Sequence, residues 1–276
     1  MILNQENKIK LFNLNIFSKD KDILLEEIKQ HLKNQDQLKI VFTPNSEQVV
    51  AISRNKSYYQ LFLKADYLIP DGYGLVWASK MLNANFKDKT LKERIAGIDL
   101  TNDLLKLSLA NNWPCLLIGG RNYHKIKSSN WIIKKVENLD KVYYFVNIDN
   151  KGNFFWFNGF DDKNSMLVGQ IREMEVVLEK LKIKCILVAL GFPDQEKFII
   201  DNSQILVKKK IQLPLVVGGS FDMILNKVKR APFLIQQWHL EWLWRLFRQP
   251  WRLKRQLQLI RFVLLVFKQK LKNYLS

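Results

Sequence analysis

The sequence predicts an α/β protein with a doubly wound, mostly parallel, Rossmann-like sheet and a basic amphipathic helical appendage at its C-terminal end. Three observations support this prediction. Short and almost entirely apolar runs alternate with segments of helical periodicity, which is the pattern of a parallel sheet covered on both faces. Small or polar turn residues follow several of these runs. Residues 227–276 combine tryptophans with a large excess of Lys and Arg.

The strands and helices follow from the period of the apolar residues. The runs expected to form strands are residues 38–43, 66–72, 114–120, 141–146, 184–191 and 213–219. Helices are expected from about Ser46, over 74–82, from about Asp99, and over 164–182. Ligands of doubly wound sheets bind at the carboxyl ends of the strands. The residues that follow each run are therefore the first candidates for a site.

Charge divides the chain into two parts, 1–226 and 227–276. The second part holds twelve Lys and Arg against one acid, Glu241, and so supplies +11 of the net charge of +18. Such a charge predicts a polyanionic partner: nucleic acid, anionic lipid or a phosphorylated substrate. The N-terminus has no apolar core typical of a signal peptide, and no run approaches the ~18–20 apolar residues of a membrane span. We expect a soluble or peripheral protein in a reducing compartment, with Cys115 and Cys185 as buried thiols.

Asp71 is the first candidate for chemistry. It ends an apolar run and is followed by Gly72, whose missing side chain lets a ligand or another backbone come close. A carboxylate in this place could deprotonate an attacking hydroxyl group. The alternative interpretation, which the local sequence alone favours, is an aspartate that caps a helix or a turn.

Thr43 and Asn45 follow another run. Helix capping and contact with a substrate are both open for Asn45, because each needs a short polar side chain, and Ser46 is a second candidate cap. Glycine turns after other runs could present backbone N–H groups to an anion, although isolated turns of this kind are more often structural. These turns comprise Gly119, Gly120, Gly191, Gly218 and Gly219.

The sequence gives little support to metal or dinucleotide chemistry. Neither GxxxxGK[ST] nor GxGxxG is present, so a dinucleotide-dependent oxidoreductase is disfavoured. His31, His124 and His239 are scattered, and no HExxH or paired-cysteine spacing occurs. We therefore expect no metal and no cofactor. A diphosphate leaving group would then need arginines or helix N-termini to stabilise its charge.

The C-terminal part has the pattern of a helix that lies in a membrane interface. Arg245, Arg248, Arg252 and Arg255 are spaced to line one helical face if Pro250 does not interrupt it. One alternative is a helix packed on the core with a solvated basic face. Another is a nucleic-acid-binding segment with stacking tryptophans, although no recognised nucleic-acid-binding module is present.

Eight stretches, in order over roughly residues 9 to 256, together resemble the WecG/TagA/CpsF glycosyltransferases. They are TPNSE (43–47), ADYLIPDGYGLVWASK (65–80), ERIAGIDL (93–100), LIGG (117–120), NGF (158–160), LVALGFPDQEKFI (187–199), VGGSFDMILNKVKRAP (217–232) and LEWLWRLFRQPWRLKR (240–255). The resemblance implies an inverting, metal-independent transfer of an N-acetylmannosamine-type sugar, or a related hexose. The donor would be a UDP-sugar, and the acceptor a polyprenyl-diphosphate-linked N-acetylglucosamine of teichoic acid or a similar surface glycan.

The resemblance also implies roles for particular residues. Asp71 matches the proposed catalytic base, Thr43 and Asn45 match the polar pair beside it, and Arg94 matches an active-site arginine. Further positions are expected to bind substrate, and they are Gly72, Gly119, Gly120, Gly191, Gln195, Glu196, Gly218, Gly219, Arg230, Arg245 and Arg252. The tail would dock on an anionic membrane from the cytoplasm or an organellar stroma and close the site. Nucleic acid is not expected as a partner, and a homo-oligomer is left open.

Two features depart from the family pattern. Asp194 stands where relatives often have Lys or Arg, which would weaken the local attraction for a donor phosphate. The chain also continues some twenty residues past the usual end of the family. This extension would either add membrane affinity or be peculiar to this chain.

Overall fold

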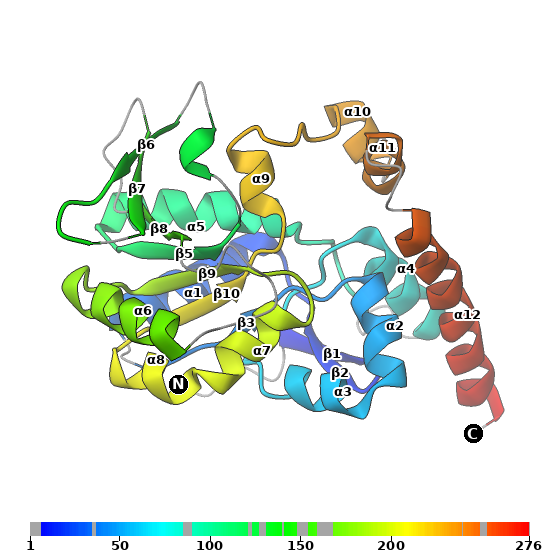
Figure 1. Cartoon of the computed structure of the whole chain (residues 1–276). Coiled ribbons are helices and arrows are strands. Elements are labelled where there is room, and N and C mark those ends of the chain that lie inside the picture. The colour runs from blue at the N-terminus through cyan, green and yellow to red at the C-terminus, as the bar shows by residue number, and fades with distance from the viewer. Residues whose placement is uncertain are drawn as a thin grey trace.

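The structure of the chain is a computed structural model (Figure 1). It describes residues 7–34, 37–84, 90–120, 123–126, 131–139, 141–147, 154–158, 168–238, 240–248 and 253–275.

A mixed sheet of eight described strands forms the centre of the molecule, in the order β4-β3-β10-β9-β5-β8-β7-β6. The strands are β3 (Val41–Phe42), β4 (Tyr67–Leu68), β5 (Cys115–Gly119), β6 (Trp131–Lys135), β7 (Val142–Asn147), β8 (Phe154–Phe157), β9 (Cys185–Ala189) and β10 (Leu213–Val216). Neighbours from β4 to β8 are parallel, and β7 is antiparallel to both β8 and β6. The mostly parallel α/β fold expected from the sequence is thus confirmed.

The antiparallel end of the sheet was not expected. Residues 141–146 were grouped with the strands of a parallel sheet, but β7 runs antiparallel between β6 and β8. The sequence also gave no expectation for β6 or β8. The physical reason is that an antiparallel edge can leave one face in water, so β6 lacks the continuous apolar run of a central strand and ends in two exposed lysines, Lys134 and Lys135.

Helices cover both faces of the sheet, as Figure 1 shows. One face carries α1 (Lys21–Asn34), α5 (Gly97–Asn111) and α9 (Ser220–Ile224), whose apolar residues share one core cluster. The other face carries α2 (Ser46–Arg54), α3 (Lys56–Phe62), α4 (Tyr73–Leu82), α6 (Val168–Lys180), α7 (Asp194–Asp201) and α8 (Ser203–Lys208). The predicted helices therefore correspond to α2, α4, α5 and α6, with ends shifted by a few residues.

The strand order creates a switch point between β3 and β10. From β3 the chain continues to β4 on one side, whereas β10 is preceded by β9 on the other side. Thr43 joins the two ends, because its Oγ1 donates a 3.4 Å hydrogen bond to the Val216 carbonyl. Ligands of doubly wound folds bind at such a place, outside the carboxyl ends of the strands. The residues after β3, β4, β9 and β10 consequently meet at the carboxyl ends of these strands, a region that we call the switch edge.

The C-terminal part forms α10 (Phe233–Gln237), α11 (Glu241–Arg248) and α12 (Leu253–Leu275). Figure 1 shows α12 beside α2 and α4, where Phe262 and Val266 are buried. Phe262 also meets Phe12, at the turn between β1 (Lys8–Leu11) and β2 (Leu14–Phe17), with 5.7 Å between ring centroids. None of the described helices has the length and apolar character needed to cross a membrane. The domain boundary after residue 226 stays a prediction.

Candidate active site

Asp71 lies at the carboxyl end of β4 and is half-buried, so its carboxylate is held in place without being sealed in the core. Its backbone N–H donates to the Pro44 carbonyl at 2.9 Å, and its Oδ1 accepts from the Gly97 N–H at 3.3 Å. Gly97 is the first residue of α5, and the positive end of a helix stabilises a negative charge. Asp71 does not cap the helix that follows it, because Gly72 occupies that place. The aspartate is therefore an oriented, negatively charged group at the switch edge.

Two arginines near Asp71 are bound by carboxylates. Arg94 Nη2 donates to Glu241 Oε2 at 2.9 Å, and Arg230 binds both oxygens of Asp99 at 2.6 and 2.8 Å. Arg230 Nε also lies 3.9 Å from Glu241 Oε1. We call these five residues, Asp71, Arg94, Asp99, Arg230 and Glu241, the charged corner. Because Glu241 belongs to α11, the charged corner joins the C-terminal part to the sheet edge.

The ionisation of the charged corner follows from these contacts. The hydrogen bond to Asp99 raises the pKa of Arg230, and the nearby charges of Glu241 and Asp71 act in the same direction. Burial is the largest single effect and by itself would raise the pKa of the Asp99 carboxyl, but the hydrogen bonds and charge of Arg230, together with the charges of Lys21 and Arg94, lower it. The corner thus holds three negative groups and two positive ones. Two of the four arginines that the sequence assigned to the site, Arg94 and Arg230, are thus paired with carboxylates of the chain itself.

Asp99 and Glu241 were missed as site residues by the sequence reasoning. One signal for Glu241 was available, since it is the single acid among twelve Lys and Arg in residues 227–276. A buried acid in such a segment is expected to pair with a cation. Asp99 carried no comparable signal, because an acid in the first turn of a helix is common for dipole reasons alone.

A second group of polar residues lies after β3 and β9, and we call Asn45, Gln48, Gln195 and Glu196 the neutral corner. Asn45 caps α2, because its side chain accepts from the Gln48 N–H at 3.1 Å and the Gln48 side chain accepts from the Asn45 N–H at 3.0 Å. This reciprocal pair is a capping box. Capping by Ser46 was wrong, since Ser46 is the first helical residue. The Asn-x-x-Gln spacing was the signal that could have found Gln48.

Glu196 is the centre of the neutral corner and is fully buried. Its Oε1 accepts hydrogen bonds from Gln48 Nε2 and Gln195 Nε2, each at 3.0 Å. Burial raises the pKa of Glu196 to about 7, against the lowering effect of these hydrogen bonds. The structure therefore brings the Gln-Glu pair together with Asn45, although Gln195 is itself buried and exposes 4% of its surface.

The glycines at this edge fall into two classes. A Cβ atom would meet no atom of the described residues within 4 Å at Gly72, Gly191, Gly218 or Gly219. At Gly119 a Cβ would lie 2.7 Å from the Ala189 carbonyl oxygen, and at Gly120 it would lie 2.3 Å from the Tyr123 ring. The first class leaves backbone open to a ligand, whereas the second is explained by packing. We retain only the first class as candidate phosphate contacts.

The remaining predicted arginines are not placed at the site. Arg245 lies on α11 with a side chain outside the described residues, and Arg252 falls wholly outside them. Their assignment to a diphosphate stays a prediction. Arg248 stacks its guanidinium over the Trp244 ring, 5.0 Å from the ring centroid.

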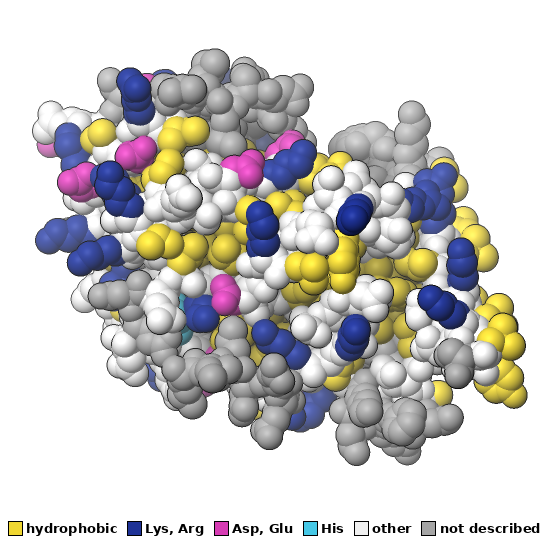
Figure 2. Space-filling view, turned by 90° about the horizontal axis from the view of Figure 1, so that it is seen from below, with side chains coloured by type: hydrophobic (Ala, Val, Ile, Leu, Met, Phe, Trp, Pro, Cys, Tyr) yellow, Lys and Arg dark blue, Asp and Glu magenta, His cyan; other side chains and the backbone are white. Residues whose placement is uncertain are grey.

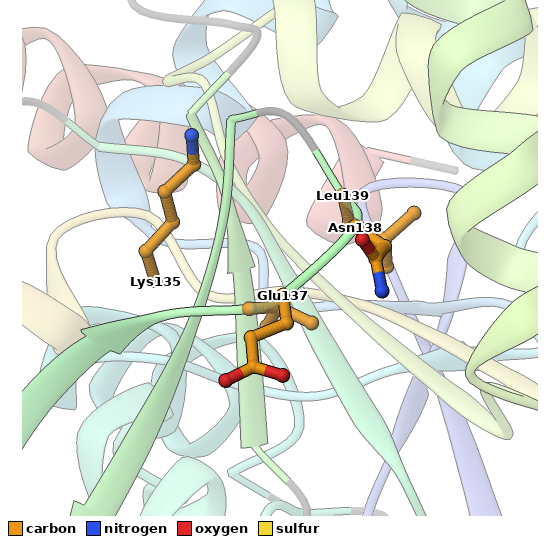
Figure 3. Close-up of a pocket in the computed structure, with 5 residues that line it drawn as sticks. Lys135, Glu137, Asn138 and Leu139 are labelled. Atoms are coloured by element: carbon orange, nitrogen blue, oxygen red, sulfur yellow. The ribbon is translucent and has the colours of Figure 1, made fainter.

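A hollow of ≈ 350 Å³ lies at the turn between β6 and β7, lined by Lys135, Val136, Glu137, Asn138 and Leu139 (Figure 3). It lies beside the edge strand β6, at the other end of the strand order from β4, and no residue of either corner lines it. With neighbouring strands ~4.8 Å apart, the two edge strands are separated by roughly 30 Å. In the described part of the chain, no group of three or more His, Cys, Asp or Glu side chains could hold a metal ion.

The fold and the site together define a Rossmann-like enzyme with a fixed carboxylate and open glycine turns at its switch point. The sequence profile of the Glycosyl transferase WecG/TagA/CpsF family matches residues 9–276. The chain belongs to this family and is a glycosyltransferase.

Named relatives are similar over most of their length. The N-acetylglucosaminyldiphosphoundecaprenol N-acetyl-beta-D-mannosaminyltransferase of Bacillus subtilis (strain 168) is 29% identical over 246 residues, 89% of this chain and 86% of the relative. The protein of the same name from Bacillus spizizenii is 28% identical over 86% of this chain and 82% of the relative. That from Staphylococcus aureus (strain NCTC 8325 / PS 47) is 26% identical over 80% of this chain and 77% of the relative.

Proposed function

We propose that this enzyme transfers an N-acetylmannosamine-type sugar from a UDP donor to a polyprenyl-diphosphate-linked N-acetylglucosamine, with inversion at the anomeric carbon. The observation that carries this proposal is the Asp71 carboxylate, fixed by the Gly97 N–H at the switch edge and still partly exposed. The names of the three relatives support the acceptor and the sugar. We also propose a role in the synthesis of teichoic acid or a similar surface glycan, as the family resemblance implies.

The reaction is a single displacement. Asp71 accepts the proton of the acceptor hydroxyl as its oxygen forms a bond to the anomeric carbon, and the bond from that carbon to UDP breaks on the opposite face. General-base assistance of this kind contributes roughly 10²–10⁴-fold. The leaving diphosphate lies over the open turns of Gly191, Gly218 and Gly219, where backbone N–H groups can stabilise its charge.

Arg94 is the arginine that we assign to this step. Thr43 and Asn45 act beside the base, as the resemblance implies. Arg94 can bind a phosphate once Glu241 releases it, because one guanidinium cannot serve two anions in full. Arg230 is held more firmly by two hydrogen bonds to Asp99. Its contribution is to keep the C-terminal part on the charged corner.

The C-terminal helices present a surface suited to a membrane. Large apolar side chains are exposed on α10 to α12, and they are Phe233, Leu234, Trp238, Trp242, Phe247, Leu257, Ile260, Val263, Leu264, Phe267, Leu271, Tyr274 and Leu275. Figure 2 shows such side chains with Lys and Arg among them on its right side, where α12 lies in Figure 1. We propose that this surface docks on the cytoplasmic leaflet, where anionic lipid attracts basic residues by ~1 kcal/mol each.

The enzymatic part is tested with a panel of UDP-sugars and a short-chain polyprenyl-diphosphate N-acetylglucosamine acceptor. Mass spectrometry should show an added N-acetylhexosamine, and NMR of the product should show inverted anomeric configuration. Retention of configuration, or transfer only to water with every acceptor, would contradict the proposal.

The membrane part is tested with liposomes. The full chain should sediment with vesicles that contain phosphatidylglycerol and remain in solution with neutral vesicles at physiological salt. The variant Leu264→Asp, Leu271→Asp removes two exposed apolar side chains of α12 while leaving the buried Phe262 and Val266 in place. Equal sedimentation of this variant and the wild type would contradict membrane docking by α12.

A further inference from the structure

The buried carboxyl group of Glu196 has one oxygen that is fully used and one that is not. Oε1 accepts from Gln48 Nε2 and from Gln195 Nε2. The orientation of the Gln48 amide is fixed independently, because its Oε1 accepts from the backbone N–H of Asn45. Glu196 Oε2 is buried and has no hydrogen-bond partner among the described residues.

A second buried acceptor shares this condition. Oε1 of the neighbouring Gln195 is also buried and lacks a partner in the described part of the chain. Leaving a buried acceptor unpaired costs roughly 1–3 kcal/mol, and more if it carries charge. A single proton on Glu196 Oε2 removes both costs, because a carboxylic acid and an amide can exchange two hydrogen bonds side by side.

The charges around Glu196 are consistent with a neutral group. From α7 itself, Asp194 acts on it electrostatically and raises its pKa. From α2, the residue that faces it is the neutral Gln48. Burial is the largest effect and brings the pKa of Glu196 to about 7. No cation that would favour the ionised form is among these neighbours.

We propose that Glu196 is a neutral carboxylic acid in the working enzyme, and that its proton joins Glu196 Oε2 to Gln195 Oε1 within the first turn of α7. This bond fixes the carboxyl group so that Oε1 stays in place for the hydrogen bond from Gln48 that ties α7 to the start of α2, and we call the two contacts together the lock. Glu196 is then a positioning residue, since it acts through Gln195 and through Gln48, which holds the Asn45 cap. The lock spans the end of β10, because β10 lies between β3, which precedes α2, and β9, which precedes α7.

The consequence for catalysis rests on the proposed function. A donor diphosphate over the turns of Gly191 and Gly218 would lie beside the lock. A protonated Glu196 keeps these turns at a fixed spacing and adds no negative charge that would repel the diphosphate. Loss of the proton at alkaline pH would introduce a buried charge near the diphosphate and break the bond between Glu196 Oε2 and Gln195 Oε1, while the bond from Gln48 would remain. Turnover should therefore fall as the pH rises past about 7.

The first test needs no substrate. Difference infrared spectra of the wild type minus Glu196→Gln should show the carbonyl stretch of a protonated carboxyl group that disappears as the pH rises through about 7. The folded pKa is raised above the ordinary 4.5, so the stabilising effect is complete below about pH 4.5 and is lost as the pH approaches 7. Thermal unfolding should show this loss in the wild type relative to Glu196→Gln. Absence of the infrared band at pH 6 would overturn the proposal.

The second test uses turnover and a conservative rescue. Glu196→Gln places an amide where the acid stood, so its N–H can donate to Gln195 Oε1 at every pH. We expect its kcat/KM at pH 6 to lie within about threefold of wild type, with no decline near pH 7. Glu196→Ala should lose at least tenfold at all pH values. Equal pH profiles for wild type and Glu196→Gln would overturn the positioning role, whereas absence of sugar transfer by wild type would count against the proposed function alone.

Discussion

The charged corner and the neutral corner lie on the same edge of the sheet but satisfy their polar groups in different ways. In the charged corner, Arg94 and Arg230 are each held by a carboxylate, and the groups come from positions 71 to 241 of the chain. In the neutral corner, three amides and one acid share hydrogen bonds without a cation. Only the charged corner includes residues of the C-terminal part, namely Arg230 and Glu241.

This difference indicates that the two corners have different roles at the carboxyl ends of the strands. The strength of an ion pair depends on salt concentration, and its members can exchange each other for a charged ligand. The hydrogen bonds of a buried uncharged network instead fix the positions of its side chains and depend little on salt. A net charge of +18 for the whole chain does not describe either corner. The charged corner even holds more acids than bases. Asp99 and Glu241 pair with the two arginines, and Asp71 adds a third acid.

Replacing Asp71 by Asn should affect turnover more than any other change. The amide cannot accept the hydroxyl proton, so we expect kcat to fall by about 10²–10⁴-fold with little change in UDP affinity. Asp66, just before the same strand at its amino end, is the matched control, and Asp66→Asn should keep kcat within a few-fold. A wild-type kcat for Asp71→Asn, measured with the true acceptor, would remove the chemistry from the charged corner.

Replacing Glu241 by Gln should break the contact between the C-terminal part and the sheet edge. The change leaves the partly buried Arg94 unpaired, so we expect a loss of about 3 kcal/mol in the free energy of unfolding. It also removes one of three negative groups, so UDP should bind more tightly. Urea unfolding and calorimetric titration measure the two effects. Glu173→Gln, which breaks a pair between half-exposed Lys141 and Glu173, should cost below about 1 kcal/mol. Similar costs for both variants would mean that the charged corner behaves as ordinary surface.

Alanine substitutions at two glycines should separate filled from open turns. Both Gly119 and Gly191 have positive φ, of 92° and 84°, and strain of this kind costs about 1 kcal/mol. Gly119→Ala adds a clash with the Ala189 carbonyl, so we expect about 2 kcal/mol in urea unfolding and no specific effect on KM. Gly191→Ala should cost less stability and raise KM for the donor. The reverse pattern would place the donor elsewhere.

Replacing Asn45 should have the smallest effect on stability and should resolve its two interpretations. Loss of the cap in Asn45→Ala should cost about 1 kcal/mol in thermal unfolding. Asn45→Ser restores a capping oxygen, so its stability should be close to wild type. If turnover recovers together with stability, Asn45 acts only as the cap. If stability recovers and turnover does not, Asn45 also contacts the substrate.

The sequence could predict the fold well because the central strands are buried on both faces. Runs such as 184–191 and 213–219 must be apolar throughout, and the turns that follow them are marked by glycine. The edge strand β6 escaped prediction for the opposite reason, since it is only partly covered and ends in two exposed lysines instead of forming a continuous apolar run. The position of Asp71 was correctly placed at a strand end, but its contact with Gly97 joins residues 26 positions apart that no local pattern connects.

Which residues pair at the site depends on contacts between segments that are far apart in the sequence. Local rules were enough to propose a cap after β3, and the Asn-x-x-Gln spacing contained the capping box. Local rules could not show that Arg94 would bind Glu241, 147 positions away, or that Gln48 would reach Glu196 across the end of β10. Such pairs depend on which strand ends meet.

The sequence by itself determined the α/β class, the switch-edge residues and the basic, apolar character of the C-terminal part. These features follow from composition and from the periods of helix and strand, which act within a few residues. Only the tertiary structure decided that Arg94 and Arg230 are paired with acids and that Glu196 is buried among amides. Burial and ion pairing depend on segments brought together by the strand order, and a single stretch of sequence does not contain its neighbours in space.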